Sequence, residues 1–416
     1  MNILGFEEAL AEVLKHAQSH RRQQQNPKTE TVPLLKAAGR VLAEPILADR
    51  DQPPFDRATR DGYAVRASEL SSRHSLQLIG QVRAGESWSK APMAAEEAIE
   101  IMTGAPVPDG ADAVVMIEHV TVDGEVVRSI EGRTLRVGDN IVPQGSEAHR
   151  GDVVVTAGSP MGAAEIAQTA SCGFSEVRVY PKPTVAIVAT GDELVELDQV
   201  PAAHQIRNSN SYALAAMVEN AGAEPLRFDI ARDTRDQLLD RIEVGRKSDL
   251  LLFSGGVSMG KFDLVEEVLL ELGAEFFFTG VKMQPGKPLV FGRLPEKEGD
   301  DRGPERYFFG LPGNPVSTQV TFHCFVEPLL RALCGEDIAG PRFVQATLAE
   351  DIAGKPELTR VLPARLAYDL KRPTVRLVSW QSSGDLAANA RANCYAVFPA
   401  EPSEFQAGDV ISVLLR

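Results

Sequence analysis

Apolar and polar positions follow different spacings along the chain, and each spacing predicts one kind of segment. Apolar residues recur at helical intervals over residues 6–17 and again over 33–48, so we predict two helices there. Over residues 52–150, short apolar runs such as 76–83 and 112–122 alternate with turns rich in glycine, proline and aspartate. This pattern is typical of short strands and predicts a β-rich segment.

Further along, a helical pattern over residues 160–173 is followed by a regular alternation of strand and helix patterns. Strands are expected at 185–190, 224–231, 249–256, 275–281 and 306–310. Helices are expected at 211–222, 234–245, 262–273 and 316–335. The alternation indicates a doubly wound, mostly parallel sheet. About five short strands over residues 342–416 predict a small barrel or sandwich.

These changes divide the chain into four predicted parts. We expect a split helical region made of residues 1–51 and 149–180, on either side of an inserted β-rich lobe over 52–148. An α/β domain is expected over 181–335, and a carboxy-terminal β-barrel over 336–416. The predicted fold class is therefore an α/β multidomain protein.

Composition narrows the classes of protein that fit. Of the 416 residues, 44% are hydrophobic and 24% are charged, which indicates a folded globular chain. The 43 lysines and arginines are outnumbered by 58 aspartates and glutamates, giving a net charge of −15. We therefore expect no nucleic acid and no anionic membrane as partner. The apolar runs are too short to span a bilayer, and no signal-peptide pattern is seen.

The cysteines indicate a reducing compartment. Cys172, Cys324, Cys334 and Cys394 show no Cys-x-x-Cys spacing. We expect them to be free thiols in a cytoplasmic protein, without a zinc site.

Three acidic residues are predicted to meet at one edge of the sheet. Glu193, Asp233 and Asp263 each follow one of the predicted strands, and ligands of open α/β sheets bind at the carboxyl ends of strands. Mg²⁺ typically takes one or two carboxylates together with phosphate oxygens. A cation site is favoured over three separate helix caps, although one acid at such a position is usually a cap.

Two loops at the same edge are candidates for binding an anion. Their residues are Ser254, Gly255, Gly256 and Ser258 in the first loop, and Pro312, Gly313, Asn314 and Pro315 in the second. Each precedes a predicted helix, whose free N–H groups attract a phosphate. A tight turn explains the first loop about equally well, and a rigid cap explains the second. Lys282 and Lys287 flank a nearby Pro-Gly turn and would neutralise an anion, unless they are ordinary exposed lysines.

Seven motifs occur in one order along the chain. They are PPFDRATRDGYAV (53–65), IMTGAPVPDGADAVV (101–115), VAIVATGDEL (185–194), SGGVSMGKFD (254–263), MQPGKP (283–288), GLPGNPVS (310–317) and SSGDLAANARANCYAVFP (382–399). Each motif is weak alone. Together they resemble the molybdopterin molybdenumtransferase family, which includes MoeA and the E domain of gephyrin, over nearly the whole chain.

The resemblance implies an architecture and a reaction. The family forms elongated homodimers, in which the molybdopterin-binding α/β domain of one subunit meets the β lobe of the other at the active site. The implied reaction inserts molybdate into adenylylated molybdopterin and releases molybdenum cofactor and AMP, with Mg²⁺. The implied partners are a molybdopterin adenylyltransferase and molybdoenzyme apoproteins or their chaperones.

The resemblance also implies roles for residues outside the α/β domain. Asp61 and Thr103 of the β lobe would join the acids of the crevice as catalytic residues, while Pro312 and Pro315 would line it. Arg360 and Ser383 match a basic and a hydroxyl position in the family's barrel.

Two departures from the family's pattern affect charged positions. The family often has Gly-Glu-Asp where this chain has Gly138-Asp139-Asn140. It commonly has a lysine where this chain has Gln284, so Lys282 is a candidate to supply that charge.

Two other functions compete with molybdate insertion. A related stand-alone α/β domain adenylylates molybdopterin, but the additional lobe and barrel argue against that activity here. A non-catalytic scaffold, as in gephyrin, would not need the acids around the crevice.

Overall fold

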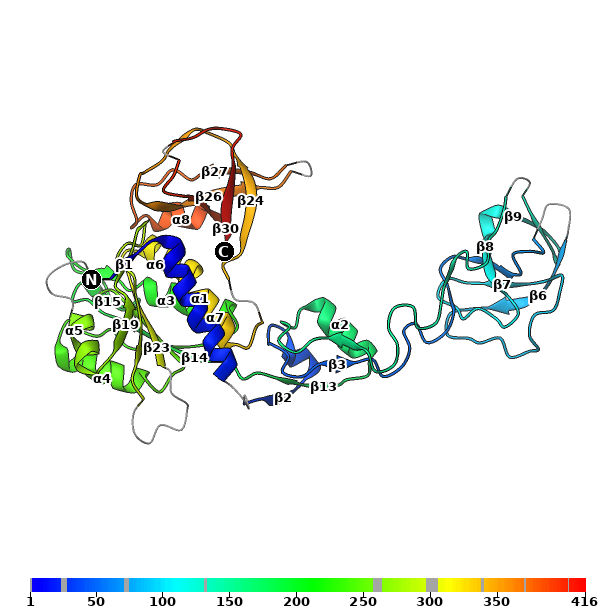
Figure 1. Ribbon diagram of the computed structural model, residues 1–416, viewed down its shortest axis with the longest axis horizontal. Coiled ribbons are helices and arrows are strands. Elements are labelled where there is room, and N and C mark those ends of the chain that lie inside the picture. Colours follow the sequence, from blue (N-terminus) through cyan, green and yellow to red (C-terminus); the bar gives the residue numbers. More distant parts are fainter. Residues whose placement is uncertain are drawn as a thin grey trace.

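The computed structural model describes residues 2–23, 28–70, 75–130, 133–256, 264–296, 306–337, 340–369, 372–402 and 404–416. The molecule is elongated (Figure 1). The α/β domain and the barrel lie together at one end, the β lobe lies at the other end, and a narrow segment connects them. Both marked chain termini lie at the end that carries the α/β domain.

The α/β domain contains the predicted doubly wound sheet. Its strand order is β17-β14-β18-β23-β22-β19. In that order the strands are Glu224–Arg227, Thr184–Ala189, Leu250–Ser254, Arg306–Leu311, Val290–Leu294 and Glu275–Phe278. The first four strands are parallel, and β22 runs antiparallel to both of its neighbours, β23 and β19. The sheet is therefore mostly parallel, as predicted, although the sequence pattern does not indicate β22.

The helices of this domain also match the predicted pattern. They are α3 (Asn210–Asn220), α4 (Arg235–Gly245) and α5 (Leu264–Glu271). The long helix expected over 316–335 consists of α6 (Pro315–Thr321), a π-helical turn (Phe322–Val326) and α7 (Glu327–Leu333).

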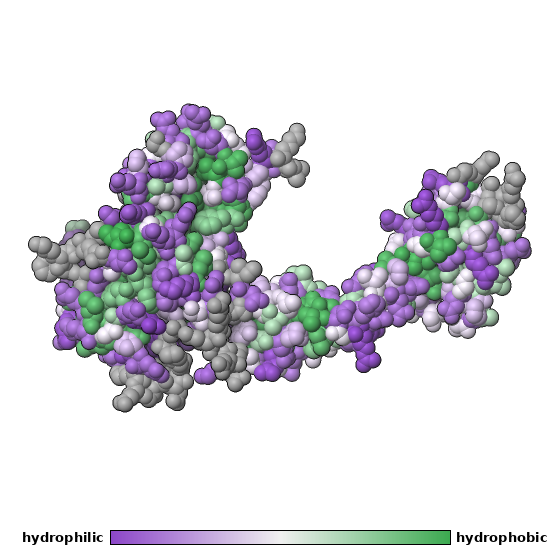
Figure 2. Space-filling view, in the orientation of Figure 1, coloured by the Kyte–Doolittle hydropathy of each residue, from purple (hydrophilic) through white to green (hydrophobic). Residues whose placement is uncertain are grey.

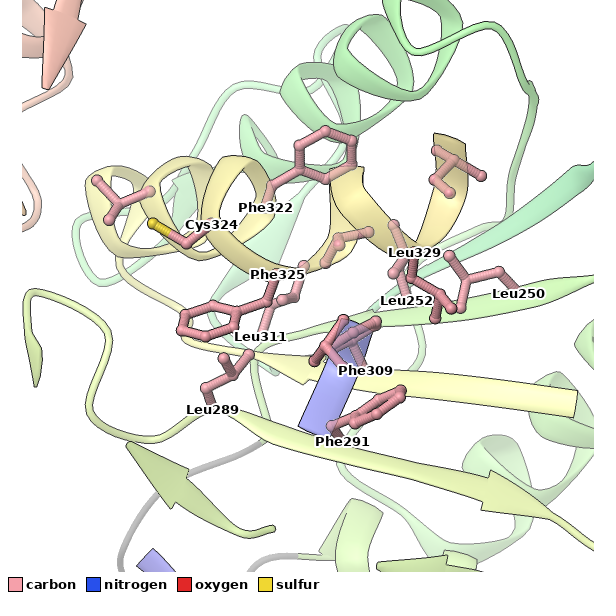
Figure 3. Packing of buried hydrophobic residues seen from close by; sticks show 14 of the residues in the cluster. Leu250, Leu252, Leu289, Phe291, Phe309, Leu311, Phe322, Cys324, Phe325 and Leu329 are labelled. Carbon is pink, nitrogen blue, oxygen red and sulfur yellow. The ribbon is translucent and has the colours of Figure 1, made fainter. Parts of the chain in front are cut away.

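The main hydrophobic core lies between this long helix and the sheet (Figure 3). Phe325 and Leu329 of the helix are fully buried, as are Leu252, Phe291 and Phe309 of the strands. The rings of Phe291 and Phe309 stack with their centroids 4.5 Å apart. Burying one such side chain contributes about 1.5–3 kcal/mol. This core holds the strands, and hence the loops at their ends, in fixed register.

Helix α1 (Phe6–Gln23) packs on the α/β domain rather than on the connecting segment. The ring of Phe6 meets that of Phe325 edge-on, with centroids 5.4 Å apart. Strand β1 (Ile3–Leu4) pairs with β20 (Gly280–Val281) of the same domain. The chain therefore contributes to the α/β domain before it enters the connecting segment.

The connecting segment contains the two stretches of chain that flank the β lobe. Strand β2 (Glu30–Pro33) pairs with β13 (Glu176–Val179), and β3 (Ile46–Leu47) pairs with β12 (Val153–Val155). Helix α2 (Ala163–Ser171) confirms the helical pattern predicted over 160–173.

The helix predicted over residues 33–48 is wrong. Only Leu34–Ala37 are helical, as a short 3-10 turn. Gly39 then has φ +73, which turns the chain, and Leu42 forms a β-bridge with Val179. Pairing with the returning stretch thus replaces the helical hydrogen bonds that the apolar spacing suggested.

The predicted β-rich lobe is built on a six-stranded sheet of order β8-β5-β7-β6-β10-β9. In that order the strands are Ala113–Met116, Gly62–Val65, Glu97–Ile101, Leu76–Val82, Val126–Ser129 and Val120–Asp123. The short pair β4 (Arg57–Ala58) and β11 (Ile141–Val142) lies beside it. Trp88 of this lobe donates its indole N–H to the Ala91 carbonyl at 2.8 Å.

The chain enters and leaves the lobe at one point. The N–H of Gln52 donates to the carbonyl oxygen of Ala148 at 2.8 Å, and the N–H of Ala148 donates back at 3.1 Å. The lobe is therefore an insertion whose two ends are held side by side.

The carboxy-terminal strands form the predicted barrel, in which β26, β27, β24, β30 and β28 close because β28 also pairs with β26. In that order they span Thr359–Ala367, Thr374–Leu377, Phe343–Leu348, Val410–Leu415 and Cys394–Phe398. Strand β21 (Met283–Gln284) of the α/β domain pairs with β26 and joins the two bodies. The short helix α8 (Leu386–Arg391) precedes β28.

The surface is predominantly polar on the face shown in Figure 2, where apolar side chains gather only in small groups. Among the described helices, none combines the length and apolar composition needed to cross a bilayer. The four cysteines are buried free thiols.

Candidate functional site

The carboxyl ends of the parallel strands share one edge of the sheet, and Thr190 connects the loops that begin there. Thr190 follows β14 and is buried. Its N–H donates to the carbonyl oxygen of Ser254 at 3.1 Å. Its hydroxyl donates to Oδ1 of Asp233 at 2.8 Å. One side chain therefore orients a predicted catalytic acid beside the predicted phosphate loop, a role that the sequence alone does not reveal.

The structure places two of the three predicted acids at this edge. Glu193 and Asp233 are exposed in the loops after β14 and β17, and these loops are joined by a β-bridge between Thr190 and Ala231. Asp263 lies outside the described residues. Among the residues that the structure does describe, no group of three histidine, cysteine or acidic side chains could hold a metal.

The glycines of the first loop are required by the backbone. Gly255 and Gly256 have φ values of +90 and +67. A Cβ on Gly255 would lie 2.5 Å from the carbonyl oxygen of Thr190, and one on Gly256 would lie 2.7 Å from Cγ2 of Val265. The N–H of Gly255 already donates to Leu311 at 3.3 Å. The tight-turn explanation therefore holds at both positions, and Gly255 is not an N–H donor for an anion.

Asn210, at the start of α3, links the two predicted anion loops. Its Nδ2 donates to Oγ of Ser254 at 2.9 Å and to the carbonyl oxygen of Gly313 at 2.8 Å. In the sequence, Asn210 stands only next to a predicted helix. A carboxamide before a helix is too common to single out, and the partners are 44 and 103 residues away in the chain.

The second loop is a rigid turn at the start of α6. Asn314 is the N-cap and Pro315 is the first helical residue. The buried hydroxyl of Thr318 donates to the carbonyl oxygen of Pro312 at 2.6 Å. The buried Thr318 hydroxyl thus stabilises the turn from its buried side, and Gly313 and Asn314 remain exposed.

A cavity of about 510 Å³ lies where the α/β domain meets the barrel. Its lining residues are Met283, Gln284, Pro285, Gly286, Lys287, Pro288, Pro312, Asn314, Ser317, Lys355, Leu358, Trp380, Gln381, Ser382 and Ser383. The structure therefore brings Lys287, Pro312, Asn314 and Ser383 together, although they come from two bodies. The N–H of Val316 donates to the carbonyl oxygen of Ser383 at 2.9 Å and ties the barrel to this wall.

The barrel wall of this cavity contains two residues that were not predicted as site residues. Lys355 is exposed and forms no ion pair with the residues that the structure describes. Trp380 packs against both the α/β core and the barrel core. No motif marks either position, since both depend on how the barrel meets the α/β domain.

Two predicted basic residues do not line this cavity. Lys282 is exposed outside it. Arg360 faces Gln284 in the β21–β26 pair, and its guanidinium donates to the carbonyl oxygen of Ala353 at 2.6 Å. Burial lowers the pKa of Arg360. Its Nε is buried without a described partner.

Asp61 and Thr103 form a second polar site, on the β lobe. Both the backbone N–H and the hydroxyl of Thr103 donate to Oδ1 of Asp61, at 2.7 and 2.8 Å. These bonds lower the pKa of Asp61, the backbone bond most. In Figure 1 the lobe lies far from the α/β domain of the same chain. One chain therefore does not bring Asp61 to Glu193 and Asp233.

Fold and site define a multidomain α/β protein whose sheet edge lies next to a cavity between the α/β domain and a barrel. Family models match the chain in three blocks: the MoeA N-terminal region (domain I and II) over residues 4–173, a probable molybdopterin binding domain over 186–332, and the MoeA C-terminal region (domain IV) over 345–415. The chain belongs to the molybdopterin molybdenumtransferase family of transferases, which confirms the resemblance.

Individual relatives agree with this assignment. A molybdopterin molybdenumtransferase of Staphylococcus aureus (strain COL) is 34% identical over 399 residues, which cover 94% of this chain and 92% of the relative. One from Staphylococcus epidermidis is 32% identical over 421 residues, covering 99% and 95%. Two crystal structures of the molybdopterin biosynthesis moeA protein from Pyrococcus horikoshii are 27% and 31% identical, with TM-scores of 0.76 and 0.70. They cover 100% and 99% of both chains, and they confirm the fold class.

Proposed function

We propose that this protein inserts molybdate into adenylylated molybdopterin and releases molybdenum cofactor and AMP. One observation carries the proposal beyond family membership. The turn from Pro312 to Pro315 contacts both the sheet edge and the cavity. Its Gly313 carbonyl oxygen accepts a hydrogen bond from Asn210 at the sheet edge. Its Pro312 and Asn314 line the cavity. A phosphate-bearing pterin bound at the sheet edge and an oxyanion bound in the cavity would then be neighbours.

The acids of the sheet edge fit Mg²⁺. Glu193 and Asp233 are exposed carboxylates on adjoining loops, and a site of this kind needs only one or two carboxylates plus phosphate oxygens. Asp233 uses Oδ1 to accept from Thr190, which leaves Oδ2 for a cation. When bound, Mg²⁺ would neutralise charge that develops on the diphosphate. We propose Asp263 as a third ligand on the family resemblance alone.

The cavity suits molybdate as the second substrate. Lys287 and Lys355 come from opposite bodies and supply two positive charges for a dianion. Ser382, Ser383 and Asn314 add groups that can donate hydrogen bonds to its oxygens.

We further propose that the working protein is a homodimer. The β lobe that contains Asp61 and Thr103 lies far from the α/β domain of its own chain (Figure 1). A second chain would supply them by placing its β lobe over the crevice.

The direct test supplies the purified full chain with adenylylated molybdopterin, molybdate and Mg²⁺ and measures released AMP. We expect release to require both molybdate and Mg²⁺, and to fall at least tenfold in Asp233→Asn. A control variant, Asp236→Asn, alters an exposed acid in the first turn of α4 and should retain activity. Absence of AMP from the wild-type mixture would contradict the proposed reaction.

A further inference from the structure

The hydrogen bonds around Asn210 have a direction that the structure determines. A backbone carbonyl oxygen can only accept, so the atom of Asn210 that lies 2.8 Å from the Gly313 oxygen must be the donor, Nδ2. The same nitrogen lies 2.9 Å from Oγ of Ser254. Its second hydrogen therefore points to that hydroxyl, and Ser254 is the acceptor of this bond.

This direction decides what the Ser254 hydroxyl can do. Because Oγ accepts from Asn210, its own hydrogen must point to another acceptor. Ser254 is 2% exposed, and within the described part of the chain its hydroxyl donates to no group. Among the described residues the hydrogen thus has no acceptor, and a ligand bound at the start of the glycine loop can supply one.

We propose that Asn210 is a positioning residue that makes Ser254 a hydrogen-bond donor to the anionic group bound at this sheet edge. The relay runs from the Gly313 carbonyl through the Asn210 carboxamide to the Ser254 hydroxyl and then to an oxygen of the ligand. It also fixes the distance between the two loops. The inference rests on the proposed function, because it takes the ligand to be the phosphate of molybdopterin.

A purely structural role for Asn210 is the alternative. In that case the carboxamide only ties Ser254 and Gly313 together, and its replacement would lower stability without changing what Ser254 contributes to binding. The two roles differ in one measurable quantity, the cost of removing the Ser254 hydroxyl in two backgrounds.

The experiment is a double-mutant cycle on the full chain, read by calorimetric titration with anaerobically prepared molybdopterin. Ser254→Ala should weaken binding by roughly tenfold or more, the usual cost of a hydrogen bond to a charged group. Asn210→Asp replaces the donor by an acceptor, so the Ser254 hydrogen turns toward the introduced carboxylate. In that background Ser254→Ala should cost less than about twofold, because the donor to the ligand is already lost.

Asn220→Asp is the matched control, since it makes the same change at an exposed position in the last turn of α3. It should leave molybdopterin affinity unchanged. Asn210→Leu removes both donors without adding charge and should also reduce the cost of Ser254→Ala.

The outcomes separate the inference from the proposed function. Equal costs of Ser254→Ala in the wild-type and Asn210→Asp backgrounds would overturn the relay while leaving the proposed reaction intact. No effect of Ser254→Ala in the wild type would overturn it as well. A wild-type chain that binds no molybdopterin would overturn the relay, whereas the AMP-release assay with adenylylated molybdopterin tests the proposed reaction separately. Melting temperatures of each variant confirm that the binding values refer to folded protein.

Discussion

At the scale of single residues, the bond between Thr103 and Asp61 gives a pH-dependent prediction. Thr103 lowers the pKa of Asp61 through its backbone N–H and its hydroxyl, so the interaction is complete above the ordinary pKa of aspartate. It is lost as the pH falls through the lowered pKa. Thr103→Val keeps the backbone bond but removes the hydroxyl, and the pKa of Asp61 should move up toward its ordinary value.

The measurement is an NMR titration of the Asp61 carboxyl group in both proteins. Thr121→Val, at an exposed position in strand β9 of the same lobe, is the control and should leave the titration unchanged. A titration midpoint that stays the same or falls in Thr103→Val would contradict the assignment.

Thr190 gives a second prediction at this scale. Thr190→Val preserves the side-chain shape and removes the bond to Asp233. We expect a loss of about 1 kcal/mol in the free energy of unfolding. A freely rotating Asp233 should also raise the Mg²⁺ concentration that gives half-maximal AMP release, by several-fold.

Thr169→Val tests whether any buried threonine would give this result. Its hydroxyl donates to the Glu165 carbonyl oxygen inside α2, so stability should fall similarly while the Mg²⁺ dependence stays unchanged. The same shift in both variants would mean that Thr190 has no specific role at the metal site.

Site residues could be predicted from the sequence where they follow directly after a strand with a clear apolar pattern. Glu193 and Asp233 follow strands whose patterns are clear, so their place at the sheet edge follows from topology. Asn210, Thr190 and Lys355 could not be found this way. Their importance lies in contacts between segments distant in the chain, and no local pattern encodes such a contact.

At the scale of elements, the turn between β18 and α5 yields a prediction about stability. Gly256→Ala would place a methyl group 2.7 Å from Val265 and 2.9 Å from the Thr190 hydroxyl, at a φ of +67. A non-glycine residue in this region costs about 1–3 kcal/mol. Chemical denaturation should show a loss of at least that size.

Val265→Ala in the Gly256→Ala background tests the steric part of this cost. It removes Cγ2 of Val265 and should reduce the effect of Gly256→Ala compared with the effect in the wild type. An equal or larger effect would mean that backbone strain alone accounts for the loss. Molybdopterin affinity of the folded variant decides whether the loop also binds phosphate.

Elements themselves could be predicted well in the α/β domain and less well in the connecting segment. Strands such as β14 and β18 are almost entirely apolar and buried, which gives a clear pattern. Residues 33–48 have helical spacing too, but Gly39 reverses the chain and tertiary pairing uses the backbone groups. Strand β22 was not predicted, because its antiparallel direction breaks the regular alternation of strands and helices on which the prediction rests.

At the scale of the whole molecule, separation of the two polar sites predicts complementation between chains. Asp61→Ala and Asp233→Ala should each abolish AMP release as pure proteins. If the site combines two subunits, random mixing gives half mixed dimers, each with one intact site of two. Activity should then recover to about a quarter of the wild type.

The control mixes Asp233→Ala with Glu193→Gln, two changes in the same body. Their mixed dimers contain no intact site, so no recovery is expected. Recovery in this control, or none in the first mixture, would contradict a shared site. Equilibration of subunits is checked by mass spectrometry of differently tagged chains.

The two tryptophans of the chain make its separate bodies visible to fluorescence. Trp88 lies in the β lobe, with the ammonium of Lys90 5.0 Å from its ring centre, whereas Trp380 lies at the seam between the α/β domain and the barrel. In a Trp88→Phe chain, all indole emission comes from the cavity wall. Molybdate entering the cavity should change that emission, and the change should be weaker in Lys355→Met at equal molybdate concentration. In Trp380→Phe, by contrast, all indole emission comes from Trp88 in the β lobe. The unfolding of each body can therefore be followed by its own fluorescence.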